Sequence, residues 1–103
     1  MNLSNQDIDI LEESLHQFIF SEYEDIPKSE KIRLNDLALQ IINKLKNKEL
    51  DFNANHLSIM SYSLYELISF VENSSMTKDS DYKNFLNRAR FLYNSFEKIL
   101  NSL

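Results

Sequence analysis

Residues 82–103 read YKNFLNRARFLYNSFEKILNSL, and the spacing of the apolar residues in this stretch decides the fold class. Steps of three and four residues alternate between Tyr82, Phe85, Ala89, Leu92, Phe96, Ile99 and Leu103. Such steps place all of these side chains on one face of an α-helix, the face that packs in a helical bundle. The stretch therefore predicts a long amphipathic helix from about Asp79 to Ser102.

The same periodicity predicts three further helices, over about residues 5–24, 28–48 and 54–72. Ser4 is followed three residues later by Asp7, a spacing typical of a capping box at a helix start. Pro27 suits the beginning of the second helix, and Asp51 or Asn53 can cap the third. No long segment alternates apolar and polar residues as a strand would, so we expect an all-α chain.

Short connections between four helices of about 20 residues favour an antiparallel, up-down-up-down bundle. The chain of 103 residues has the length of one domain, so we assign residues 1–103 to a single helical-bundle domain. The alternative is a helical hairpin that completes its core by forming a dimer.

The absence of two residue types excludes several classes of enzyme. The chain has no glycine, and phosphate-binding loops and the nucleophile elbow of hydrolases need glycine to take their usual shape. It has no cysteine, so disulfides, thiol catalysis and thiolate metal sites are excluded. A cytoplasmic location is then the expectation. The chain has no run of about 18 apolar residues, so we expect no membrane span. Abundant Asn, Ile and Lys favour AT-rich coding, as in a low-GC bacterium or its phages.

The candidate catalytic groups are few. Glu13 and His16 have the Glu-x-x-His spacing of carboxylate-bridged di-iron bundles, but the chain has no second pair of this kind. Glu12 and His16 project toward one flank of the first helix, so we interpret them as a solvated pair on the helix surface. The sequence thus predicts a protein that is not an enzyme, with no catalytic residue, metal ligand or cofactor.

Each predicted helix also carries apolar residues away from its inward face. Phe91 lies beside Arg88, and aromatic and arginine side chains are typical of interface hot spots. We predict a partner-binding surface that includes Tyr62, Phe70, Arg88 and Phe91, for a protein partner or for a second copy in a homodimer. Single exposed apolar residues are also normal on monomers, which is the alternative interpretation. The full off-face set is Ile10, Phe20, Ile32, Leu39, Ile59, Tyr62, Phe70 and Phe91.

Charge is unevenly distributed along the chain, whose net charge is −5. Residues 1–26 contain seven acidic residues and no Lys or Arg, and predict an acidic face at Asp9, Glu12 and Glu13. This face can pair with basic helices of the same bundle or with a basic partner. Direct nucleic-acid binding is disfavoured, because affinity for phosphates comes from an excess of Lys and Arg.

Two functional hypotheses follow from these patterns. The first is a small, non-catalytic cytosolic protein that binds or inhibits a protein partner. The second is an acidic antagonist of a nucleic-acid-binding protein, of the phage-inhibitor or immunity type. Neither hypothesis involves a membrane.

Overall fold

The computed structural model describes residues 2–74 and 80–103, which form four α-helices and no strand. The prediction of an all-α chain is thereby confirmed for the described residues. The expected start of the last helix at position 79 lies outside them. The helices are α1 (Asn5–Phe20), α2 (Lys28–Lys46), α3 (Ala54–Glu72) and α4 (Ser80–Asn101).

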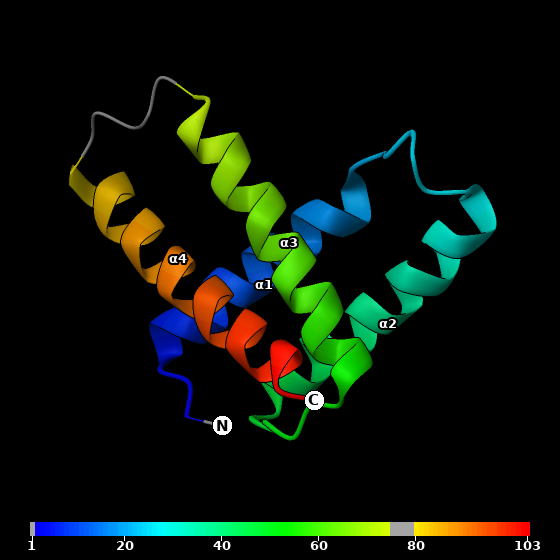
Figure 1. Ribbon diagram of the computed structural model, residues 1–103, viewed down its shortest axis with the longest axis horizontal. Helices are drawn as coiled ribbons and strands as arrows, with labels where there is room; N and C mark the ends of the chain where they lie inside the picture. The colour runs from blue at the N-terminus through cyan, green and yellow to red at the C-terminus, as the bar shows by residue number, and fades with distance from the viewer. Residues whose placement is uncertain (1, 75–79) are drawn as a thin grey trace.

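Helices α1 and α3 form the centre of the bundle-like fold. The backbone of α1 approaches all three other helices, as does that of α3, whereas α2 and α4 make no backbone contact within the described residues. Figure 1 shows α4 on one side of α3 and α2 on the other, with α1 passing behind α3. In a square four-helix bundle, α1 and α3 would lie on a diagonal. The contacts between the helices do not establish the antiparallel up-down-up-down order, which stays a prediction.

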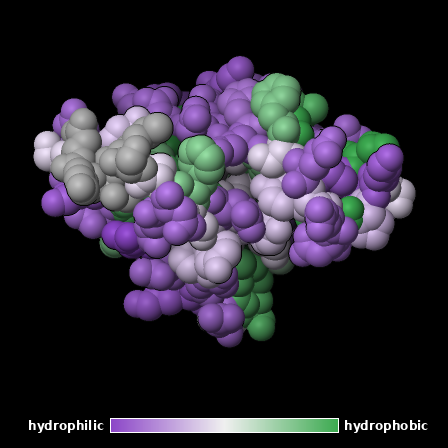
Figure 2. All heavy atoms as spheres, turned by 90° about the horizontal axis from the view of Figure 1, so that it is seen from above, coloured by the Kyte–Doolittle hydropathy of each residue, from purple (hydrophilic) through white to green (hydrophobic). Residues whose placement is uncertain are grey.

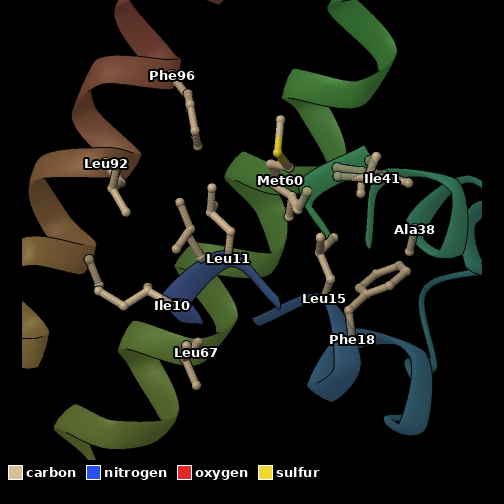
Figure 3. Close-up of a cluster of buried hydrophobic side chains, with 14 of the residues drawn as sticks. Ile10, Leu11, Leu15, Phe18, Ala38, Ile41, Met60, Leu67, Leu92 and Phe96 are labelled. Carbon is tan, nitrogen blue, oxygen red and sulfur yellow. The ribbon is translucent and has the colours of Figure 1, made fainter. Parts of the chain in front are cut away.

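The hydrophobic core surrounds this central pair. Figure 3 shows Ile10 of α1 on the side of α4 and Phe18 on the side of α2, so one helix buries side chains in two directions. Ile10 and Ile59 are both buried, and the expectation that they lie outside the inward faces was wrong. A helix with three neighbours needs a wider apolar face than one stripe provides.

The helix starts follow from local capping. The predicted capping box is present at α1, where Asp7 N–H donates to Ser4 Oγ (3.1 Å) and Ser4 N–H donates to Asp7 Oδ2 (3.0 Å). At α3 the cap is Asn53, whose Oδ1 accepts from His56 N–H at 2.9 Å. His56 Nδ1 accepts from Asn53 N–H in return. Helix α3 begins and ends at the predicted residues.

Helix α1 ends at Phe20, four residues before the predicted end, because side chains satisfy its last carbonyl groups. Lys31 of α2 donates from Nζ to the carbonyl oxygens of Phe18 (2.9 Å) and Ile19 (3.3 Å). Ser21 Oγ donates to the carbonyl of Gln17 at 2.7 Å. These bonds replace the partners that a further helical turn would have supplied.

Helix α2 ends at Lys46, two residues before the predicted end, in a Schellman motif built without glycine. Glu49 N–H donates to the carbonyl of Lys44 (2.9 Å) and Lys48 N–H to that of Leu45 (3.1 Å). The motif needs a left-handed residue, and Lys48 fills this place with a φ of 55°. A side chain with a Cβ atom is strained in that conformation.

We expect the Lys48→Gly variant to raise the free energy of unfolding by about 0.5–1 kcal/mol, because glycine takes a positive φ without strain. Lys48→Ala is the matched control, since it also removes the bond from Nζ to Asn5 Oδ1 but keeps the Cβ atom. Urea unfolding of both variants measures the difference. Equal stability of the two would show that the backbone at this position is not strained.

Candidate functional site

A predominantly apolar hollow lies between α1, α3 and α4. Its volume is about 530 Å³. The C-terminal half of α1 and the C-terminal part of α3 provide two walls, and the beginning of α4 provides the third. We call this hollow the apolar groove; its lining consists of Glu13, His16, Gln17, Phe20, Leu67, Phe70, Val71, Asp81, Tyr82 and Phe85.

Two phenyl rings of the apolar groove are open to solvent. Phe20 is 83% exposed and Phe70 is 59% exposed, whereas Leu67 and Val71 beneath them are buried. The end of the molecule seen in Figure 2 is mainly hydrophilic, with separate hydrophobic patches between the polar side chains. Large rings that gather at one hollow from separate helices are typical of binding surfaces.

The polar rim of the groove consists of Glu13 and His16 from α1 and Asp81 from α4. Glu13 and His16 are both exposed. Within residues 2–74 and 80–103, no cluster of three His, Asp or Glu side chains could hold a metal ion. The rim places charged and hydrogen-bonding side chains at the edge of an apolar surface.

Tyr62, a predicted partner-binding residue, lies outside the groove in an aromatic cluster. Its ring centroid is 5.9 Å from that of Phe18 and 5.8 Å from that of Tyr23. Burial, with the nearby Glu66 and Asp25 carboxylates, raises the pKa of Tyr62 to about 12. The Tyr62 ring therefore packs α3 against α1 and against the α1–α2 connection.

Arg88 makes its strongest contacts inside the molecule. Its Nε and Nη2 donate to the two carboxylate oxygens of Asp7 at 2.6 and 2.8 Å. Asp7 is fully buried, and the Arg88 guanidinium holds the pKa of that carboxyl below its usual range. The guanidinium also lies 4.5 Å from the ring centroid of Phe91, which is 55% exposed. Phe91 thus covers an ion pair on its inner side and faces solvent on its outer side.

The structure places the predicted site residues on three different surfaces. Phe70 and Glu13 share the apolar groove, while Tyr62 and the Arg88–Phe91 pair lie elsewhere. Asp9 is exposed and Glu12 is half-buried, and of the predicted acidic face only Glu13 lines the groove.

Among the groove residues that sequence reasoning missed as site residues are three with aromatic rings, Phe20, Tyr82 and Phe85. Phe20 was recognised only as one of the off-face apolar residues, although it is the most exposed ring of the groove. Tyr82 and Phe85 were assigned to the inward seam of the last helix. Tyr82 lies in the first turn of α4, where the inward face of the helix extends past the core. This position near the helix end was the sequence signal that could have identified Tyr82 as a site residue.

Comparisons with protein-family models, curated proteins and solved structures found no match to this chain. In the part of the chain that the structure describes, no helix is both long enough and apolar enough to cross a membrane.

We expect Arg88→Met to lower the melting temperature by more than about 10 °C, because it leaves the buried Asp7 carboxylate without its cation. Arg90→Met is the matched control: Arg90 pairs with Glu72 at 2.6 Å, and both side chains are largely exposed. That change should lower the melting temperature by less than about 5 °C. Thermal unfolding followed by circular dichroism measures both. Similar effects of the two substitutions would contradict a structural role of the Asp7–Arg88 pair.

Proposed function

We propose that this chain is a non-catalytic protein-interaction module, whose apolar groove binds an amphipathic helix of a protein partner. The observation that carries the proposal is the convergence of Phe20, Phe70 and Tyr82 from three helices on one hollow. A groove between helices that offers exposed rings above an apolar floor suits the apolar face of a further helix. The rings would supply the anchoring contacts.

The charge of the groove wall favours a basic partner. Helix α1 contains no Lys or Arg, and Asp9 and Glu13 on it are exposed. Glu13 and Asp81 stand on the rim at opposite walls of the groove. A partner helix with Lys or Arg beside its apolar residues would meet complementary charge, which speeds and orients association. We infer a cytosolic setting in a low-GC bacterium or a phage, which agrees with the composition.

An acidic antagonist of a nucleic-acid-binding protein is the second candidate. It is favoured by the exposed carboxylates of Asp9 and Glu13 and the half-buried one of Glu12. In this case the partner would be the basic surface that otherwise binds phosphates, and the acidic face would contribute more than the phenyl rings.

The groove can be tested with a displayed library of helical peptides of about 20 residues, selected on the wild-type protein. We expect the selected peptides to carry apolar anchors at steps of three and four residues, flanked by Lys or Arg. Binding should weaken at least tenfold with Phe70→Asp, because a charge replaces an exposed ring of the groove. Titration calorimetry or fluorescence anisotropy measures the affinity.

Leu39→Asp is the matched control for this experiment. Leu39 is also an exposed apolar residue, but it lies on α2 and does not line the groove. We expect it to change the affinity less than twofold. Selected peptides without apolar anchors, or equal losses in the two variants, would overturn the proposed binding mode. Charge reversal at Glu12 and Glu13 that alone abolishes binding would favour the antagonist.

A homodimer is the competing explanation for the exposed rings, and Phe91 is the residue that tests it. If two copies associate through the surface that carries Phe91, the solution mass of the wild-type protein corresponds to a dimer and that of Phe91→Asp to a folded monomer. Because the Phe91 ring already packs on the Arg88 guanidinium, its place on the surface needs no second copy, and we expect a monomer in both cases. Light scattering over a range of concentrations measures the mass, and a dimer would assign Phe91 to self-association.

A further inference from the structure

A second cleft, rich in tyrosine, runs between α3 and α4 and shares no lining residue with the apolar groove. Its volume is about 450 Å³. Residues at helical spacings on both helices line it, so it follows the seam between them. The lining consists of Ser58, Ser61, Tyr62, Tyr65, Tyr93, Glu97 and Leu100.

Two tyrosine rings and one carboxylate are central to this cleft. The ring centroids of Tyr65 and Tyr93 are 6.0 Å apart with an angle of 43° between the planes. Ser61 Oγ donates to Glu97 Oε1 at 3.0 Å, which fixes the carboxylate at the cleft. A carboxylate has about four acceptor positions, so this bond leaves room for further donors. Burial and a hydrogen bond to the Glu97 carboxylate raise the pKa of the Tyr93 hydroxyl, so Tyr93 occupies a second acceptor position of this carboxylate.

The same chain places a cation against aromatic rings and oxygen acceptors at two other sites. Arg88 stacks on Phe91 and forms two bonds to the carboxylate of Asp7. The Nζ atom of Lys31 lies 4.6 Å from the ring centroid of Phe18 and donates to backbone carbonyls. Both sites combine the ring face with oxygen acceptors, and each contains its own cation.

The tyrosine cleft has the rings and the carboxylate but no cation from the described chain. The ion pairs within residues 2–74 and 80–103 involve Glu30, Asp51, Asp7 and Glu72, and none involves Glu97. None of the cation–ring contacts in these residues involves Tyr65 or Tyr93. The chemistry of the cleft thus matches that of the Arg88 site with the guanidinium removed.

We propose that the cleft of Tyr65, Tyr93 and Glu97 binds an arginine side chain of a protein partner. The planar guanidinium would stack on a tyrosine ring while two of its N–H groups donate to the Glu97 carboxylate. Arginine suits this geometry better than lysine, because only a planar guanidinium can lie flat on a ring and donate two parallel N–H groups to one carboxylate. Exposed tyrosines are also the residues that protein-binding surfaces favour.

This inference deepens the proposed function, because it names a second contact with the same class of partner. The two contacts differ in the partner side chains that they bind: the groove binds apolar side chains, and the cleft binds a cation. Since no residue lines both, each can be tested without the other.

The test uses the full chain with isotope-labelled tyrosine and follows the ring signals by NMR during addition of the peptide Gly-Arg-Gly. We expect saturable shifts of the Tyr65 and Tyr93 signals with a dissociation constant of about 1–10 mM, the range of a single charged contact. The matched peptide with citrulline, which has the shape of arginine without its charge, should cause no saturable shift. Gly-Lys-Gly should bind at least threefold more weakly than Gly-Arg-Gly.

Variants of the cleft complete the experiment. Glu97→Gln keeps an oxygen that accepts from Ser61 but loses the charge, and it should weaken binding at least fivefold. Tyr65→Phe keeps the ring and should bind like the wild type, whereas Tyr65→Leu should bind at least threefold more weakly. Tyr65 is 54% exposed, so both changes leave the core intact.

Three results would overturn the inference. The first is an equal response to the arginine and citrulline peptides, the second an equal response to arginine and lysine, and the third wild-type affinity in Glu97→Gln. The Phe70→Asp variant separates this site from the groove, since it should still bind Gly-Arg-Gly with wild-type affinity. If the helical-peptide test of the groove fails while the response to Gly-Arg-Gly is intact, only the helix-binding proposal is overturned.

Discussion

The buried ion pair between Asp7 and Arg88 is the contact on which the position of α4 relative to α1 depends. Asp7 belongs to the first turn of α1, and Arg88 lies 81 residues later on α4. A carboxylate with no exposed surface has a large desolvation cost, which only a well-placed cation and additional donors offset. Here Arg88 donates twice and the Ser4 backbone donates once, so the helix cap and the ion pair share one carboxylate.

This pair and the buried apolar residues of α4 are satisfied by the same register of the helix, and the register determines what α4 presents on its other sides. A shift of α4 by one residue would rotate Arg88 away from Asp7 by about 100°. In the observed register, Leu86, Ala89, Leu92 and Phe96 are buried in the core. Tyr82 then faces the apolar groove, while Tyr93 and Glu97 face the tyrosine cleft. Both candidate sites therefore require the register of α4 in which Arg88 meets Asp7.

Much of the helical framework could be predicted from the sequence, because caps and periodicity are local signals. The capping box at Ser4 and the bounds of α3 were predicted from such signals. The end of α1 at Phe20 was not predictable in this way, because the group that ends the helix is Lys31 on the next helix. The burial of Ile10 and Ile59 was missed because periodicity identifies one packed face, while α1 and α3 each have three neighbours.

The candidate site was less predictable than the fold for a related reason. Sequence reasoning identified Phe70 and Phe91 as aromatic residues that lie away from the inward faces of their helices, but it could not determine which rings share a surface. That information comes from the packing: Phe91 lies over the Arg88 guanidinium, while Phe70 joins Phe20 and Tyr82 at the groove. A single exposed ring needs no explanation on a monomer, whereas rings that converge from three helices on one hollow require the tertiary fold to bring them together. Since Phe20 and Phe70 remain largely exposed there, the stability of the core does not explain them, and this exposure is what supports the proposed binding of a partner.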